Sequence, residues 1–358
     1  MKVYKCLGKT SVALIWAGVL LSIAGLFMFS EECKEGALKG IQMCLGILVP
    51  SLFPFFILSS FLAESQILHI LSPVFNPIGS FLFKIRGICL VPVILALCGG
   101  YPVGAKSVAA LYKKGEISQG EAERLSYVCC SAGPGFLVTF IGVSLLMSKD
   151  AGIILLSSQI ISMAVIMFAS RFFSFKNDHS KHESKLKEKL SFSEALVNSV
   201  SSAVRSTAGM CGFVILFSVV CNVVTAGFGA DNTFGIIIVS LLEITTGVSA
   251  VSGELSLEVI SALTGFGGFC VHMQIFSELK EIEYYKAKFY IYRILQGMLC
   301  YISTKLLLLV FPVTDMVFST VEKAPRLTFY STIAGTVALL ITSSIFILSL
   351  KKRTLLRR

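Results

Sequence analysis

The sequence predicts an all-α polytopic membrane protein, with about eight transmembrane helices and two re-entrant, broken hairpins in two inverted-topology repeats. Of its 358 residues, 55% are hydrophobic and only 15% are charged, and the mean hydropathy is +0.82. Several apolar runs approach the roughly 20 residues that cross a bilayer as a helix. Glycine-rich breaks interrupt some of these runs, and short basic loops lie beside them.

The charge and cysteine content exclude several other classes of protein. The net charge is +10, but most basic residues lie in short loops beside apolar segments, where they orient a membrane chain. Nucleic-acid binding would need a basic face on a folded domain, so no nucleic-acid partner is expected. The eleven cysteines include the pair Cys129-Cys130 but no CxxC spacing, which favours buried apolar packing over a metal site or disulfides.

The N-terminal region, residues 1–34, is predicted to be a membrane anchor. Its apolar run at 11–29 is too long for a signal peptide core and lacks a clear cleavage site, so we expect an uncleaved span. An acidic loop is expected at 31–35, and a short interfacial helix at 36–46. A second span follows at 46–63, and its two prolines predict kinks.

The next region contains two broken apolar segments. Residues 64–87 hold Pro73 and Pro77 and end in basic residues, which predicts a broken interfacial segment on the cytoplasmic side. Residues 88–112 are interrupted by glycines in their middle. A capping box at Ser118-Gln119-Gly120-Glu121 then starts a helix, which is interrupted again at 131–135.

The remaining chain contains one polar linker and further apolar runs. The linker, residues 174–193, is rich in lysine, histidine and serine and predicts a solvated cytoplasmic loop. Residues 312–358 predict a C-terminal transmembrane helix and a basic tail. Spans are predicted at 151–173, 207–227, 256–277, 289–311 and 328–350, with a short apolar segment at 234–252.

The distribution of basic residues favours two re-entrant segments. If 88–112 and 234–252 are both re-entrant, both termini are cytoplasmic and almost all of the 31 basic residues lie inside. If either segment crossed fully, several basic loops would move to the outer face. The basic residues left outside by the preferred arrangement are Lys34, Lys39, Lys149, Lys323 and Arg326.

Two repeats are predicted, at 35–173 and 194–311. When the two repeats are aligned in sequence, the stretch 97–105 matches 242–250. Gly133-Pro134-Gly135-Phe136 likewise matches Phe266-Gly267-Gly268-Phe269. Because three spans separate the starts of the repeats, their orientations are opposite. Inverted repeats with paired broken helices are typical of transporters, whose site lies where the halves meet.

The break at Cys98-Gly99-Gly100-Tyr101-Pro102-Val103-Gly104-Ala105-Lys106 is the centre of the predicted site. Its glycines free backbone groups that lipid cannot satisfy, so protein or a water-filled cavity must surround them. Lys106 follows on the first turn of the restarted helix, where a cation and a positive helix end suit a carboxylate. The alternative is a lysine whose ammonium group reaches the nearby interface.

Two further ionisable residues are candidates. Glu243 lies in the matching break of the second repeat, where it could bind a coupling cation, a proton or the solute. Alternatively, an ion pair with Lys106 could simply lock the halves together. His272 could be a proton-sensitive donor, or a buried structural hydrogen bonder.

The other candidates are residues at the breaks that offer backbone groups or neutral side chains. Small polar residues at helix contacts would explain the neutral side chains equally well. These candidates are Gly99, Gly100, Tyr101, Ser131, Gly133, Thr245, Thr246, Gly267, Gly268 and Gln274.

The motifs as a set resemble a known family. Gly-Gly-Tyr-Pro-x-Gly-Ala-Lys, Glu-Ala-Glu-Arg, Gly-Pro-Gly-Phe, Glu-Ile-Thr and Gly-Phe-Gly-Gly-x-x-x-His-Met-Gln occur in that order between about 35 and 311. They resemble the YlbJ (SpoVV) family of sporulation integral membrane proteins, which carries the nucleoside-recognition gate domain and is similar to concentrative nucleoside transporters. The resemblance implies movement of dipicolinate from the mother cell across the outer forespore membrane.

Other functions stay open at this point. Relatives with the gate domain handle nucleosides and other small solutes, and a non-transporting scaffold could use the glycines for close helix packing. No catalytic Ser/His, paired-Asp or HExxH arrangement and no GxxxxGK[ST] motif occurs, so neither an enzyme nor an ATPase is expected. A transporter would then depend on a gradient, with a proton or sodium as possible coupling ion, or on removal of the solute. Its oligomeric state is open, and no cofactor is expected.

Overall fold

The computed structural model describes residues 24–64, 67–173, 191–228, 233–250 and 255–313. Every regular element in these ranges is a helix, which confirms the predicted helical class. The predicted span at 328–350, the linker loop at 176–189 and most of the predicted span at 11–29 lie outside the described residues.

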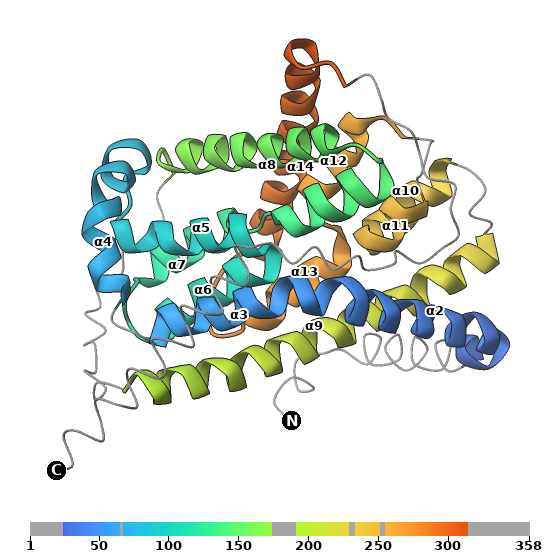
Figure 1. The fold of residues 1–358 in the computed structure, drawn as a ribbon, viewed down its shortest axis with the longest axis horizontal. Coiled ribbons are helices and arrows are strands. Elements are labelled where there is room, and N and C mark those ends of the chain that lie inside the picture. The colour runs from blue at the N-terminus through green and yellow to red at the C-terminus, as the bar shows by residue number, and fades with distance from the viewer. Residues whose placement is uncertain (1–23, 65–66, 174–190, 229–232, 251–254, 314–358) are drawn as a thin grey trace, which may run out of the picture.

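The elements are labelled as in Figure 1. The elements before the linker are α2 (Ser30–Met43), η2 (Cys44–Leu48), α3 (Val49–Glu64), α4 (Ile67–Ile78), η3 (Gly79–Phe83), η4 (Gly87–Cys89), α5 (Leu90–Gly99), α6 (Tyr101–Lys113), α7 (Gln119–Val128), η5 (Gly135–Leu145) and α8 (Lys149–Ser170). The elements after it are α9 (Phe192–Phe228), α10 (Thr233–Leu242), α11 (Ile244–Ala250), α12 (Leu257–Phe266), α13 (Gly268–Glu278) and α14 (Lys286–Val310).

Five helical stretches in the described residues are long and apolar enough to cross a membrane, and each overlaps a predicted span. A sixth candidate is the pair Ser72–Phe83 and Gly87–Gly99, which bends by 87° at its break. The chain is therefore a multi-pass helical membrane protein. The five stretches are Ser30–Leu62, Lys149–Ser170, Phe192–Ala226, Leu257–Glu278 and Lys286–Val310.

The first of these stretches corrects the prediction for residues 31–63. The expected acidic loop, interfacial helix and second span form one continuous helical stretch, Ser30–Leu62, with the π-helical turn η2 inside it. Glu31 and Glu32 lie in the first turn of α2, where negative charge is favourable beside the helix N-terminus. The segment is helical rather than looped because its acidic residues match that end of the helix.

The prediction of a broken segment at 64–87 is also wrong in its detail. Pro73 and Pro77 both lie inside α4 and do not end it. The sharp change of direction comes later, between η3 and η4, where Lys84 adopts a left-handed conformation with φ 52°. Proline is tolerated in membrane helices because neighbouring groups can satisfy the carbonyl that it leaves free.

The helices form two outer layers with the broken elements between them. The stretch α2–α3 runs beside the long α9, and α8 packs with α14, which also packs on α12 (Figure 1). The pair α5 and α6 lies between these layers, and α6 contacts both α3 and α13. Short broken helices are therefore surrounded by longer ones, as unsatisfied backbone requires in a membrane.

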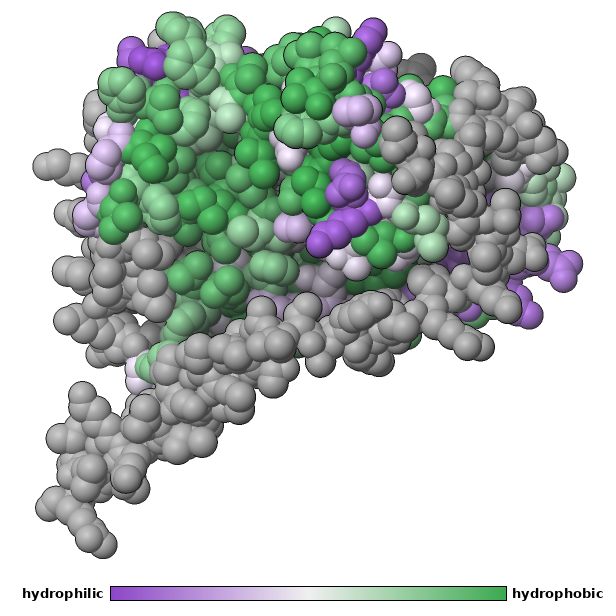
Figure 2. Space-filling view, turned by 45° about the horizontal axis from the view of Figure 1, so that its top comes forward, coloured by the Kyte–Doolittle hydropathy of each residue, from purple (hydrophilic) through white to green (hydrophobic). Residues whose placement is uncertain are grey.

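The outer surface fits a lipid environment. Large apolar side chains are exposed on α8, α9 and α14, including Phe168, Leu216, Ile294 and Leu306. Figure 2 shows apolar side chains over most of the described part of one face. Such a continuous apolar surface is too large for a soluble monomer, but is expected where lipid covers the protein.

A polar cluster at the start of α7 confirms the predicted capping box. Ser118 Oγ accepts the backbone N–H of Glu121, and the Glu121 carboxylate accepts the backbone N–H of Ser118. Arg86 adds a bidentate pair, with Nε 2.7 Å and Nη2 2.5 Å from the two oxygens of Glu121. This cluster ties the start of α7 to the bend before α5.

The Arg86–Glu121 pair predicts a pH dependence of stability. Burial alone would raise the pKa of Glu121, but hydrogen bonds from Arg86 and Ser118 outweigh it and hold that pKa below its usual value. A carboxyl whose pKa is lower in the folded state stabilises the fold above its unfolded pKa of about 4.3, and this contribution is lost as pH falls through the folded pKa. The difference in melting temperature between the wild type and Glu121→Gln should therefore be largest near neutral pH and shrink in acid. A difference that is independent of pH would contradict this role.

Candidate functional site

The first break separates α5 from α6 at Gly100. Gly100 has φ +92°, a conformation that favours glycine. The two helices fold back on each other so closely that a Cβ built on Gly104 would lie 2.6 Å from Cβ of Ala96. It would also overlap the carbonyl oxygen of Cys129. The glycines at this break thus allow a tight helical hairpin, as the sequence predicts.

The second break lies between α7 and η5 and touches the first. Residues 129–133 are not helical. A Cβ on Gly133 would lie 3.0 Å from the backbone nitrogen of Gly100 and 3.2 Å from the carbonyl carbon of Gly99. The two interruptions predicted in the first repeat are therefore in backbone contact.

The predicted second repeat, 194–311, also contains two breaks. Glu243 separates α10 from α11, and these two helices also fold back, since a Cβ on Gly247 would overlap Ser240. Gly267, with φ +93°, separates α12 from α13. A Cβ on the next residue, Gly268, would lie 3.4 Å from the nitrogen of Ile244, so these breaks also adjoin.

Tyr101 connects the two pairs of breaks. Its hydroxyl group donates a hydrogen bond to the carbonyl oxygen of Thr264 in the last turns of α12. A Cβ on Gly267 would lie 3.2 Å from Cε1 of the Tyr101 ring. Four interruptions that lie far apart in the chain, within the described residues, therefore come together around one tyrosine.

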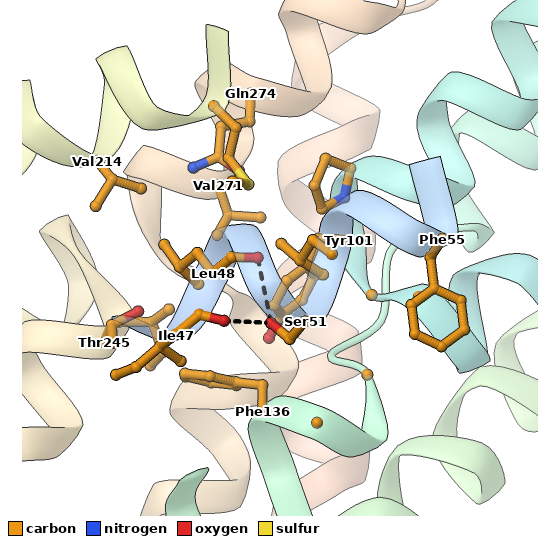
Figure 3. A pocket seen from close by; sticks show the side chains of 18 of the residues that line it. Ile47, Leu48, Ser51, Phe55, Tyr101, Phe136, Val214, Thr245, Val271 and Gln274 are labelled. Carbon is orange, nitrogen blue, oxygen red and sulfur yellow. Dashed lines mark hydrogen bonds between the residues drawn. The ribbon is translucent and has the colours of Figure 1, made fainter. Parts of the chain in front are cut away.

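A cavity lies where these breaks meet (Figure 3). Its volume is about 70 Å³ of space open to the centre of a water molecule. By this measure one water needs roughly 10–15 Å³, so the cavity can hold several waters or part of a small solute. The lining residues are Ile47, Leu48, Ser51, Leu52, Phe55, Cys98, Gly99, Gly100, Tyr101, Pro102, Gly133, Gly135, Phe136, Met210, Val214, Glu243, Ile244, Thr245, Val271 and Gln274.

Glu243 supplies the ionisable group in the cavity wall. Its side chain is 1% exposed, and its carboxylate accepts the backbone N–H of Thr245 at 3.1 Å and of Thr246 at 2.5 Å. The carboxylate therefore satisfies two backbone donors at the start of α11, beside the cavity.

Two longer helices begin at the cavity. α6 starts at Tyr101 and η5 at Gly135, and both of these residues line the cavity. The N-terminus of a helix carries partial positive charge and free N–H groups, which suit an anion. Ser51, on α3, instead donates its hydroxyl hydrogen back to the carbonyl oxygens of Ile47 and Leu48 (Figure 3).

Lys106 lies outside the cavity lining. Its Nζ is 5.1 Å from the centre of the Phe56 ring, and no ion pair joins it to Glu243 in the described structure. The two ionisable residues predicted to meet at the midplane are therefore placed differently: Glu243 borders the cavity, and Lys106 lies further along α6.

His272 also lies away from the cavity lining. Its Nε2–H donates to the carbonyl oxygen of Phe266 at 2.9 Å, at the end of α12. Rings of Phe266, Phe269, Phe289 and Tyr290 surround it edge-on. This hydrogen bond satisfies a carbonyl at the helix break, whereas Nδ1 is buried without a hydrogen-bond partner among the described residues.

The other predicted site residues divide into two groups. Gly99, Gly100, Tyr101, Gly133, Thr245 and Gln274 line the cavity. Ser131 is fully buried behind it, with its Oγ 3.4 Å from Oε1 of Gln159. Thr246, Gly267 and Gly268 stand beside the lining residues and shape the breaks.

Sequence reasoning missed Arg293 of α14, which is 1% exposed. Its guanidinium group donates to the carbonyl oxygen of Cys130 at 2.6 Å and of Tyr127 at 2.5 Å. It thereby satisfies carbonyls that the interrupted α7 leaves free. A basic residue inside a predicted span, at 289–311, was the available signal, because such residues are costly in a membrane unless they serve a purpose.

Buried polar side chains from several helices also escaped the sequence analysis. Gln159 of α8 lies 3.3 Å from Gln296 of α14 and 3.5 Å from Thr264 of α12. Ser158 and Ser261 are 2.9 Å apart, and Thr304 donates to Ser261 at 2.7 Å. Single serines and glutamines within apolar runs give no signal of their partners, which lie more than 40 residues away.

The fold and the cavity define a multi-pass helical membrane protein with paired broken helices around a central cavity. The chain is 28% identical over 341 residues to the sporulation integral membrane protein YlbJ of Bacillus subtilis (strain 168), and the match covers 84% of each chain. This similarity supports membership of the YlbJ family and agrees with the motif resemblance. With the apolar helices, it identifies a sporulation-related integral membrane protein. No family model and no solved structure matches the chain.

Proposed function

We propose that this protein transports a small anionic solute through the cavity at the four helix breaks. The observation that carries the proposal is the meeting of these breaks, which are distant in sequence, at one cavity lined by backbone as well as side chains. Interrupted helices inside a membrane are costly, and transporters use them to present helix ends and backbone groups to a solute.

The charges around the cavity support an anionic solute. Lys106 and Arg293 are buried cations with no ion-pair partner among the described residues. The Glu243 carboxylate, by contrast, accepts two backbone N–H groups at the start of α11. The starts of α6 and η5 add partial positive charge at the cavity. An anion entering this region would therefore be attracted, and it would compensate charges that are otherwise costly to bury.

The family resemblance makes dipicolinate the first solute to test. It is a planar aromatic ring with two carboxylates, and the cavity is bordered by Tyr101 and Phe136 as well as by helix starts. Transport of dipicolinate across the outer forespore membrane, out of the mother cell, would agree with the relative's description as a sporulation protein. A proton or sodium is the proposed coupling ion, and the position of Glu243 beside the cavity makes it the proposed ligand.

A nucleoside is the second candidate solute, and one observation favours it. No lysine or arginine is among the described residues that line the cavity, and its ionisable side chain is the acidic Glu243. A carboxylate accepts hydrogen bonds from ribose hydroxyls or a base amine and repels a dicarboxylate. The residues that line the cavity therefore favour a neutral heterocycle, whereas the buried cations outside the lining favour an anion.

Uptake by purified protein in vesicles separates these two solutes. Labelled dipicolinate should enter saturably, and unlabelled dipicolinate, rather than uridine, should compete. Uptake of labelled uridine that dipicolinate does not inhibit would replace the anionic solute with a nucleoside. Protein that transports neither solute, although correctly folded, would support a scaffold role instead.

We also propose that the two repeats, 35–173 and 194–311, have opposite orientations. Each has a long helix, a folded-back pair, an interrupted helix and a final long helix in the same order: α3, α5–α6, α7–η5 and α8, then α9, α10–α11, α12–α13 and α14. This order supports the proposal because inverted repeats place paired breaks at a shared site.

The proposed orientation predicts which segments are accessible from outside. Single cysteines in the loop 176–189 and at both termini should be protected in intact cells from a thiol reagent that does not cross membranes. Cysteines at 31–35 and 315–326 should react, because these stretches are placed on the outer side. Reaction of the 176–189 loop in intact cells, with lysed cells as the positive control, would exclude the inverted arrangement.

A further inference from the structure

Lys106 is a buried cation without a stable partner. Its side chain is 5% exposed, and its Nζ has no hydrogen-bond partner in the described structure. The charges that act on it are Glu278 and Arg205, and neither forms an ion pair with it. An unpaired ammonium group inside a membrane protein costs free energy, so a lysine retained there needs a compensating role.

Two buried hydroxyl groups, each about one helical turn from a residue of the cavity wall, are also unsatisfied. Ser59 Oγ on α3 and Thr207 Oγ1 on α9 are buried without hydrogen-bond partners among the described residues. Ser59 lies three residues after Phe56, whose ring contacts Lys106, so both face the same side of α3. Thr207 lies one turn before Met210 of the cavity wall. A carboxylate accepts hydrogen bonds from hydroxyl groups of this kind.

Lys106 and the two hydroxyl groups lie near residues of the cavity wall along their helices. Phe55, next to Phe56, lines the cavity, and Gln274 lines it one turn before Glu278 on α13. Beyond Lys106, Lys113 in the last turn of α6 pairs with Glu281, which follows the end of α13, and their charged groups are 3.8 Å apart. Gln119 also donates to the carbonyl oxygen of Glu283 at 2.5 Å. Lys106 therefore lies on α6 between the cavity and the exposed polar contacts at the end of this helix.

We propose that Lys106, with Ser59 and Thr207, forms a second binding position for the carboxylate of the transported solute, outside the cavity. This inference rests on the proposed transport of an anion. A solute leaving the cavity along α6 and α13 would lose its interactions with the N-termini of the helices at the cavity. Its carboxylate would instead interact with the Lys106 ammonium group and the two hydroxyl groups. After the solute has left, the Glu278 carboxylate attracts the Lys106 ammonium group. This competing attraction keeps the second position from trapping the solute.

The test compares transport, equilibrium binding and stability for Lys106→Met, with dipicolinate as the probe. Uptake into vesicles should fall about tenfold or more, as expected for loss of a charge-assisted hydrogen bond in the path. Equilibrium binding in detergent should stay within about threefold, because the cavity is intact. The melting temperature should be equal or higher, since an unpaired buried charge is removed. Lys106→Arg should retain more uptake than Lys106→Met, and the exposed Lys39→Met should behave as wild type.

Each contrary result has a distinct meaning. Binding that falls in parallel with uptake would place Lys106 in the cavity site, and a lower melting temperature with lost uptake would make it structural. Normal uptake by Lys106→Met, beside normal wild-type uptake, would overturn the second position alone. Wild-type protein that takes up no dipicolinate would overturn the proposed function itself, and with it this inference.

Discussion

Glu243→Gln is expected to lose most transport activity while reaching the membrane at a near-normal level. The carboxylate accepts the N–H groups of Thr245 and Thr246 with separate oxygens, and it borders the cavity. Glutamine keeps one accepting oxygen but presents an NH₂ group to the other N–H. Glutamine also cannot make a charged hydrogen bond to a solute or coupling ion in the cavity. Such a bond contributes about 1.5–3 kcal/mol, so uptake should fall roughly tenfold to a hundredfold.

Two further variants make the result specific to Glu243. Glu31→Gln removes an exposed acidic group from the first turn of α2, outside the cavity lining, and should transport normally. The double variant Lys106→Met, Glu243→Gln should transport no better than either single variant, because the structure shows no ion pair between these residues. Recovery of both abundance and uptake in the double variant would show that the two residues act as a structural pair.

Gly104→Ala is expected to cause the largest loss of folded protein among single methyl additions to the hairpin. The added Cβ would overlap the carbonyl oxygen of Cys129 and would lie 2.6 Å from Cβ of Ala96. Both obstacles are backbone or short side chain and cannot move independently. Overpacking of this kind costs typically 1–3 kcal/mol, enough to lower the melting temperature by several degrees and to reduce abundance.

The matched control for this substitution is Gly209→Ala on α9. A Cβ there meets no atom within 4 Å, so alanine should be neutral or slightly stabilising through its higher helix propensity. Abundance in membranes and the melting temperature in detergent measure both variants. Equal stability of Gly104→Ala and Gly209→Ala would show that α5 and α6 do not fold back as tightly as described.

The sequence by itself determined the class of protein and the location of the helix breaks. Apolar length decides whether a helix can cross a membrane, and five predicted spans recur within the described residues. Glycine acts on its own backbone, so the breaks at Gly100, Gly133 and Gly267 could be predicted locally. The capping box at Ser118 and Glu121 is equally local, because its hydrogen bonds join residues three apart.

Only the tertiary structure decided which residues share the cavity. Lys106 and Glu243 are comparable by sequence, yet one borders the cavity and the other packs on Phe56, because the rotation of each helix against its neighbours decides where a side chain points. The buried Arg293 and the contact between Gln159 and Gln296 depend on partners more than 100 residues away. Local periodicity carries no information about such pairs. The sequence therefore predicts where the backbone is interrupted, whereas helix packing selects the side chains that the interruptions face.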